Sequence, residues 1–155
     1  MNCREIKFRA WDKADNRMLS IEEINFISRK ARGVYHNTST DCGNYFEKFN
    51  NLELMQYTGL KDKNKEEIYE GDIVAVEHGT GMHGFKSTRY KVFNCPVIFL
   101  NGQFQYSWPK DYGNYRFGLN LEKSIVIGNI YQNPELLKES TDGTDSNNLQ
   151  AQTSY

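Results

Sequence analysis

Long hydrophobic runs are missing from this sequence. No stretch of 18 consecutive apolar residues occurs among its 155 residues, so no membrane-spanning helix is expected. The N-terminal segment, residues 1–7, is polar and lacks the apolar stretch of a secretion signal. These absences predict a protein that does not act at a membrane and that is located in the cytoplasm.

Cysteine is scarce, and its pattern excludes two classes of small domain. The three cysteines are Cys3, Cys42 and Cys95. They are odd in number, far apart and without a CxxC pair, which indicates reduced thiols rather than a disulfide framework. His78 and His83 could hold a metal together with His36, but their spacing matches no zinc motif. We therefore expect exposed loop histidines, with no metal site and no cofactor.

Recognisable catalytic motifs are also absent. There is no serine elbow, no HExxH, no phosphate loop and no useful Cys/His pair. Residues 79–84 match GxGxxG, but strand-like residues follow them and no acidic residue stands at the spacing that a dinucleotide site requires. The close carboxylates Glu66, Glu67 and Glu70 are typical of the solvated side of a hairpin. No catalytic residues are predicted, and the chain is not expected to be an enzyme.

The sequence has no excess of charge of either sign, because its formal net charge is −1. Proteins that bind long nucleic acids usually carry a strong basic excess, since neutralisation of phosphates drives their affinity. A long nucleic acid is therefore not an expected partner. A small nucleotide needs only two or three charges in one pocket, which this composition allows.

Short alternating segments separated by turn clusters fill most of the chain, and no long amphipathic helix is visible. Strands are predicted over residues 5–11, 18–27, 54–57, 73–77, 90–93, 97–106 and 125–127. Residues 28–50 and 78–88 are interpreted as long loops, and a short hairpin around Val34-Tyr35 is an alternative within the first. The expected fold is mainly β: a small, partly open, SH3-like barrel built from hairpins, with an additional N-terminal β segment and little helix.

Three regions follow from this pattern. Residues 1–58 are expected to form an N-terminal β segment with a long loop, and residues 59–137 a barrel-like domain. Residues 138–155 contain almost no apolar side chains and are predicted to be a disordered tail. The exposed strand edges of such a small barrel are compatible with a homo-oligomer.

The clearest local signal is an Asn-Gly pair between two alternating runs. Asn101 and Gly102 suit the two turn positions of a hairpin, which both require positive φ. This turn pairs Leu100 with Gln103 and Phe99 with Phe104. One face of the hairpin is then rich in aromatic and apolar side chains and is expected to lie in the core: Val97, Phe99, Phe104, Tyr106 and Trp108.

Three blocks of sequence resemble one protein family. The first is Arg4-Glu5-Ile6-Lys7-Phe8-Arg9-Ala10-Trp11-Asp12, the second runs from Leu54 to Asn64 and on through Glu67 to Val74, and the third runs from Ile127 to Leu137. In this order they are similar to the YopX family of phage and prophage proteins. The resemblance implies a mainly β fold and a phage setting in an infected or lysogenic bacterium, and it implies no catalytic residues. One departure is Lys65, where the family usually has Gly, so either the hairpin tip is less tight or Asn64 adopts the left-handed conformation instead.

Aromatic residues are abundant at 14% of the chain, and some of them are interleaved with cations. Aromatic rings can stack on bases while Arg or Lys meets phosphates. The alternative interpretation is that most of these rings pack in the core. The candidate ligand-binding residues are Arg9, Trp11, Tyr57, Lys61, Tyr69, Arg89, Tyr106, Trp108, Tyr115 and Arg116.

Three functions are compatible with these observations. The first is a phage accessory protein that binds and sequesters a small nucleotide-like ligand, such as a host-defence signal. The second is an adapter or inhibitor that docks on a host or phage protein of replication or defence, because Tyr-rich surfaces suit protein interfaces equally well. The third, least favoured, is a hydrolase with unrecognised carboxylates.

Overall fold

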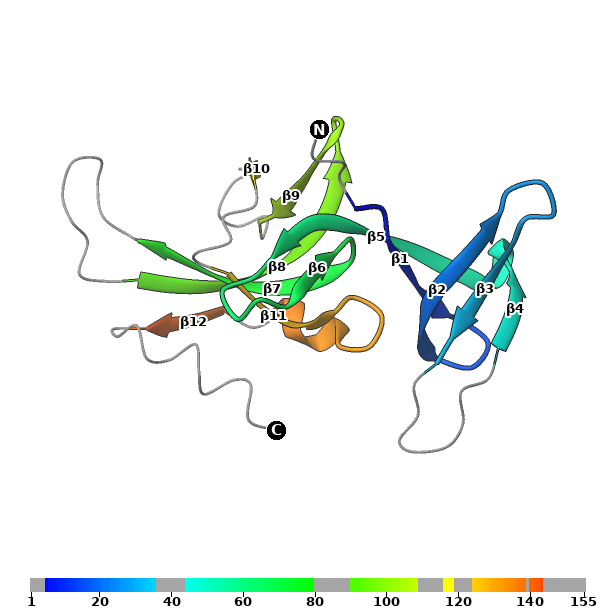
Figure 1. The fold of residues 1–155 in the computed structure, drawn as a ribbon. Coiled ribbons are helices and arrows are strands. Elements are labelled where there is room, and N and C mark those ends of the chain that lie inside the picture. The colour runs from blue at the N-terminus through cyan, green and yellow to red at the C-terminus, as the bar shows by residue number, and fades with distance from the viewer. Residues whose placement is uncertain are drawn as a thin grey trace. The chain divides into compact units, whose positions relative to one another are not determined.

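Antiparallel β-strands dominate the structure, a computed structural model (Figure 1). It describes residues 5–35, 44–79, 90–108, 116–118, 124–138 and 140–143, and only the backbone of strand residues 44, 45, 78, 79, 90, 116–118 and 140–143. Over these ranges the helices are two short 3-10 segments, η1 (Phe49–Asn51) and η4 (Pro134–Lys138). The prediction of a mainly β chain with little helix is confirmed.

The strands form two antiparallel sheets. The first has the order β4-β3-β2-β1-β5-β6, and the second has the order β10-β9-β8-β7-β11 with β12 also paired to β8. In chain order the strands are β1 (Phe8–Asp12), β2 (Arg17–Asn25), β3 (Lys30–Val34), β4 (Asn44–Lys48), β5 (Leu52–Lys61), β6 (Glu67–Tyr69), β7 (Asp72–Gly79), β8 (Tyr90–Leu100), β9 (Gln103–Ser107), β10 (Arg116–Gly118), β11 (Ser124–Asn129) and β12 (Ser140–Gly143). The described strands do not close into a barrel.

The chain divides into two compact units, residues 1–59 and 60–155. In the first unit, one face of the sheet carries the core. Its buried members are Ala10, Leu19, Ala31 and Leu52, and partly buried Ile21, Ile24, Tyr35, Phe49 and Leu54 pack against them. The four buried members come from strands β1, β2, β3 and β5, so the core depends on the pairing of all four strands.

Strands β3 and β4 lie within residues 28–50, where the sequence predicted a long loop. The loop prediction is wrong for these strands, because Lys30–Val34 pairs with both β2 and β4. The alternative of a hairpin near Val34-Tyr35 is nearer to the structure, although the paired strands are longer. The reason for the failed loop prediction is the size of the residues that face the core. A Cβ atom added at Gly33 would lie 3.0 Å from the Cβ of Leu19, so only a minimal side chain fits there. Close packing over Gly33 and Ala31 removes the bulky alternation by which a strand is normally recognised.

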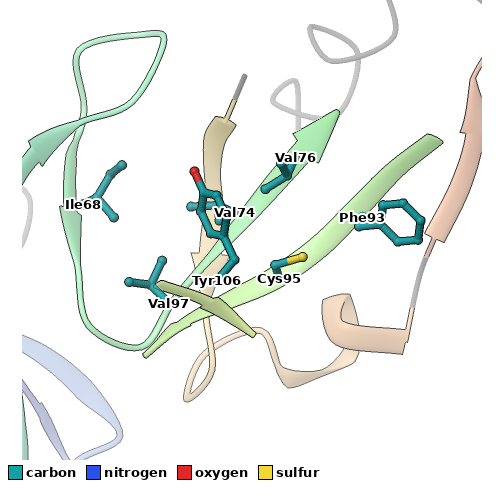
Figure 2. Close-up of a cluster of buried hydrophobic side chains, with 7 residues drawn as sticks. All are labelled: Ile68, Val74, Val76, Phe93, Cys95, Val97 and Tyr106. Carbon is teal, nitrogen blue, oxygen red and sulfur yellow. The ribbon is translucent and has the colours of Figure 1, made fainter. Parts of the chain in front are cut away.

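In the second unit, the sheet carries apolar side chains on both faces. One face holds Val74, Val76, Phe93, Cys95, Val97 and Tyr106, with Ile68 from β6, as Figure 2 shows. The opposite face holds Ala75, Val92 and Ile125. Alternation along β7 thus sends Val74 and Val76 to one side and Ala75 to the other, as the period of two requires. Burial on both faces makes this sheet the main hydrophobic core of the unit.

The β8–β9 hairpin has the predicted register. Asn101 and Gly102 form its turn with φ values of 53° and 80°, and Phe99 lies opposite Phe104. The expectation that the whole aromatic face is buried is wrong at the turn end, where Phe99 is 49% exposed and Phe104 is half-buried. These two rings pack edge to face with centroids 5.0 Å apart, and the core begins only further along the hairpin.

Buried polar side chains hold the turns of the second unit. The Asp62 carboxylate accepts the backbone N–H groups of Asn64 and Glu66 in the β5–β6 turn and of Val126 in β11, at 2.8–2.9 Å. Lys65 itself adopts the left-handed conformation in this turn, with φ of 68°, so the assignment of that conformation to Asn64 is wrong. Asp62 therefore links a turn of 62–66 to a strand more than sixty residues later.

The end of the described chain is ordered further than the sequence suggested. Pro134–Lys138 forms a short 3-10 helix, and the Leu136 carbonyl accepts a hydrogen bond from the Asn94 side chain at 2.8 Å. Ser140–Gly143 then pairs with β8 opposite residues 90–93. The prediction of a disordered tail is thus wrong for these four residues. Polar residues can occupy a strand when backbone hydrogen bonds, which do not depend on the side chain, provide the pairing.

Candidate functional site

Three of the predicted ligand-binding residues share one sheet face of the first unit. Arg9 and Trp11 alternate along β1, and Tyr57 is two positions from Met55, the partner of Arg9 on β5. Trp11 and Tyr57 are buried and Arg9 is half-buried. The Nζ atom of Lys7 lies 5.4 Å from the centroid of the Tyr57 ring. The structure brings these residues together, but it places their rings mainly inside the protein.

In the second unit the predicted residues fall into two groups. Lys61 and Tyr69 both approach Glu67: the Lys61 Nζ is 3.9 Å from one carboxylate oxygen, and the Tyr69 hydroxyl donates to the other at 2.9 Å. Tyr106 is buried in the core, and the half-buried Trp108 packs on Phe93 with ring centroids 4.8 Å apart. The remaining predictions fall outside the described side chains: Arg89, Tyr115 and, apart from its backbone in β10, Arg116.

The described residues also offer little for catalysis. Burial raises the pKa of the Cys95 thiol to about 12, so this cysteine is protonated and unreactive near neutral pH. The buried Asp62 carboxylate is engaged by three backbone donors. Over the described ranges, no cluster of three His, Cys, Asp or Glu residues could hold a metal, and no helix is long and apolar enough to cross a membrane. His36 and His83 lie outside those ranges.

The β2–β3 turn, which a backbone hydrogen bond joins to η1, carries exposed apolar side chains, and another lies on β4. Phe26 and Ile27 in this turn are 75% and 99% exposed, and Phe46 on β4 is 60% exposed. We call this region the tip surface. It consists of Phe26, Ile27, Ser28, Arg29, Lys30, Phe46, Lys48 and Asn50.

The tip surface is held in place by the core beneath it. Asn25 accepts the backbone N–H of Ser28 at 2.9 Å, which fixes the turn, and the Phe49 N–H donates to the Arg29 carbonyl at 3.0 Å. Phe26 packs edge to face on Phe49 at 6.1 Å, and Phe49 packs on the core of the unit. Exposed Phe26 therefore has a defined position, which lowers the entropy cost of using it in an interface.

Three exposed cations follow or neighbour these apolar residues in the sequence: Arg29, Lys30 and Lys48. Lys30 lies directly opposite Lys48 in the β3–β4 pair, and Arg29 precedes Lys30. Among the described residues, no ion pair joins any of the three to an acidic side chain. The nearest acidic residue along β4, Glu47, accepts hydrogen bonds from the Lys48 backbone and the Asn51 side chain. The tip surface is therefore locally basic in a chain of net charge −1.

A shallow, open depression lies within the tip surface. It has a volume of about 380 Å³ and is lined by Ser28, Arg29, Lys48 and Asn50. Pockets for small ligands usually enclose most of the ligand and are lined by apolar side chains. This depression is polar and open, so it suits an anionic group that belongs to a larger partner. Two cations and two neutral polar side chains can bind such a group by charge and hydrogen bonds.

The sequence contained a signal for this site that the alternation pattern obscured. Alternation alone predicts a strand over residues 18–27 and a loop over residues 28–50. The adjacent pair Phe26-Ile27 cannot both face the core of a strand, and the basic pair Arg29-Lys30 follows at once. Two adjacent bulky apolar residues beside cations in a turn are typical of an exposed binding loop.

Comparisons with known proteins match almost the whole described chain. A family model described as YopX protein matches residues 7–138. A solved structure, the crystal structure of protein EF1440 from Enterococcus faecalis, is similar with a TM-score of 0.54 and 27% sequence identity, covering 87% of this chain and 99% of that chain. The comparison with curated proteins gives no match. The family match spans the tip surface as well as the turns held by buried polar residues.

Proposed function

The chain belongs to the YopX family, and from this premise we propose that it is a binding protein without catalytic activity, which docks on another protein through the tip surface. The YopX family is not a known enzyme family. We further propose that the setting is a phage or prophage and that the protein acts as an adapter or inhibitor of a host or phage protein in the bacterial cytoplasm.

The observation that carries this proposal is the grouping of exposed apolar side chains. Phe26, Ile27 and Phe46 account for three of the seven large apolar residues that are exposed in the described chain. Phe26 and Ile27 are adjacent in the β2–β3 turn, and Phe46 lies on β4 opposite Arg32. Arg29, Lys30 and Lys48, which are near them along these strands, form no ion pair among the described residues. Clusters of this kind mark protein interfaces, in which a few aromatic and Arg residues supply most of the binding energy.

A photo-crosslinking experiment tests the docking surface. We would place a benzophenone amino acid at Ile27 in the full chain and, as the matched control, at Lys63, an exposed turn residue of the other unit. In a bacterial lysate, the Ile27 position should give one dominant protein adduct that the Lys63 position does not give. The double substitution Phe26→Ser/Phe46→Ser should remove capture of that protein. An adduct of equal yield from both positions would contradict the proposal.

A nucleotide-binding function is the second candidate. It is favoured by Arg29 and Lys48, which line one depression with Ser28 and Asn50 and could meet a phosphate. A ligand that binds only the folded state at a hundredfold excess over its dissociation constant stabilises that state by ~2.7 kcal/mol, which a thermal-shift assay detects. Sequestration predicts such a shift with one nucleotide, which is recovered chemically unchanged. If no nucleotide gives a shift and the crosslink forms, docking is the function.

A further inference from the structure

We infer that the tip surface recognises an acidic segment of the partner protein, with a carboxylate bound between Arg29 and Lys48 and a neighbouring apolar side chain packed on Phe26 and Ile27. This inference rests on the proposed docking function and specifies the chemistry of the partner. It follows from charge, from exposure and from the shape of the depression.

Charge is the first argument. Lys30 and Lys48 are directly opposite each other on paired strands, and like charges in this position are destabilising. Further along the same hairpin, Arg32 faces Glu22 and Glu23 and is neutralised by them. Among the described residues, no ion pair neutralises the three cations at the tip, so an anion bound there relieves their repulsion.

The limited extent of the basic region indicates a carboxylate rather than a nucleic acid. A nucleic-acid strand requires a cationic track that follows several phosphates. On this protein, a bound strand longer than the tip would have to pass Glu22 and Glu23, whose carboxylates would repel its phosphates. The basic region therefore accommodates one or two negative charges, which is the charge of a short acidic segment.

The exposed side chains give the second argument. Ile27 is 99% exposed and has no aromatic face on which a base could stack. An aliphatic side chain at this position gains most from contact with an apolar side chain of a protein partner, since removal of apolar surface from water stabilises the complex. The open depression of about 380 Å³ beside it leaves room for a carboxylate that approaches on a peptide backbone.

Fluorescent 12-residue peptides provide the test. Each peptide carries one Leu, Phe or Tyr next to one to three Asp or Glu residues, and it is paired with a neutral version containing Asn and Gln and a basic version containing Lys. Anisotropy titrations would use the full chain, an Arg29→Gln/Lys48→Gln variant and an Arg29→Glu/Lys48→Glu variant. Lys63→Gln is the matched control, because Lys63 is also exposed but lies far along the chain from the tip. Unchanged urea midpoints would show that each variant folds.

The expected pattern has three parts. Acidic peptides bind the unsubstituted chain about tenfold or more tightly than their neutral versions, as loss of one charged hydrogen bond predicts. The Gln variant loses most of this preference, and its binding weakens less with added salt, because two of the three tip cations are gone. The Glu variant prefers the basic peptides, and the Lys63→Gln control behaves like the unsubstituted chain. A purely structural role for the two cations would not reverse the preference.

Three results would overturn the inference. One is equal affinity of the unsubstituted chain for acidic and neutral peptides. Another is a preference for acidic peptides that survives undiminished in the Gln variant. The last is tight binding of a (dT)12 oligonucleotide that requires Arg29 and Lys48, without acidic-peptide binding. A different result would contradict the proposed docking function itself: no protein adduct forms from the crosslinker at Ile27. If that crosslink forms but is insensitive to Arg29→Gln/Lys48→Gln, docking stands and the acidic partner is excluded.

Discussion

Single polar residues within the family-like blocks of this chain have structural roles. Asp72 accepts the Tyr69 N–H at 2.7 Å, and the Asn129 side chain accepts the N–H groups of Tyr131 and Gln132 at 3.0 Å. Asp62 does the same for three N–H groups. Buried polar groups must be satisfied in this way, and here they define turns. The residues that make the chain recognisable as a family member therefore specify the fold, and the proposed binding residues of the tip lie between those blocks.

The Asp62 contacts predict a large loss of stability on truncation of this side chain. Asp62→Ala removes the acceptor for the N–H groups of Asn64, Glu66 and Val126, and each donor left without a partner costs about 1–3 kcal/mol when water cannot replace the carboxylate. We expect a loss of about 2–3 kcal/mol in the free energy of unfolding, measured by urea denaturation. Lys63→Ala, an exposed change in the same turn, should leave stability within about 0.5 kcal/mol. Equal midpoints for the two variants would refute this role of Asp62.

Sequence alone cannot decide whether an individual aromatic side chain is buried in the core or exposed for binding. Tyr57 and Tyr106 alternate with polar neighbours, and Trp11 alternates with Ala10 and Asp12. Such alternation is the pattern of a core and also of a surface that binds bases. The structure buries all three, because neighbouring strands supply the contacts around them. Burial depends on which strands pair, and pairing over long sequence distances is not encoded in the local pattern. Their role in ligand binding stays a prediction.

At the scale of elements, prediction succeeded where turn chemistry was local. Asn101-Gly102 fixed the register of the β8–β9 hairpin, since few residue pairs tolerate two positive φ values. Prediction failed for β3, where Gly33 and Ala31 are small because Leu19 packs closely over them. It also failed to recognise the tip surface, because the strands that present it were read as a loop. The small residues of β3 thus prevented the recognition of both the strand and the proposed site.

The β5–β6 turn offers a test of backbone strain in one element. Lys65 has φ of 68°, a conformation that costs a residue with a Cβ atom about 1–2 kcal/mol and costs glycine little. Lys65→Gly should raise the free energy of unfolding by about 0.5–1 kcal/mol after the larger chain entropy of glycine is subtracted. Lys63, in the same turn, does not have a positive φ, so Lys63→Gly should lower the free energy of unfolding. Urea midpoints compare the two, and a destabilised Lys65→Gly variant would show that the Lys65 side chain itself is required.

At the scale of the whole molecule, the two units differ in how they use their apolar side chains. The second unit has apolar side chains on both faces of its sheet and buried polar residues at its turns. The first unit has one small core and presents the exposed apolar side chains of the tip. Composition and periodicity could predict the mainly β class, because strand alternation is a local property. They could not predict which unit exposes a surface, because exposure is set by the completed sheets.

The C-terminal strand gives a prediction for the complete chain. Because Ser140–Gly143 pairs with residues 90–93, a chain that ends at Lys138 loses these backbone hydrogen bonds along one edge of β8. At about 0.5–1.5 kcal/mol for each hydrogen bond, the loss should total about 1–3 kcal/mol and lower the melting temperature by several degrees. Amide exchange at residues 90–93 should become faster. A chain that ends at Gly143 is the matched control, since it keeps β12, and it should melt like the full chain. If the two shortened chains melt at the same temperature and protect β8 equally, β12 contributes nothing to the stability of the sheet.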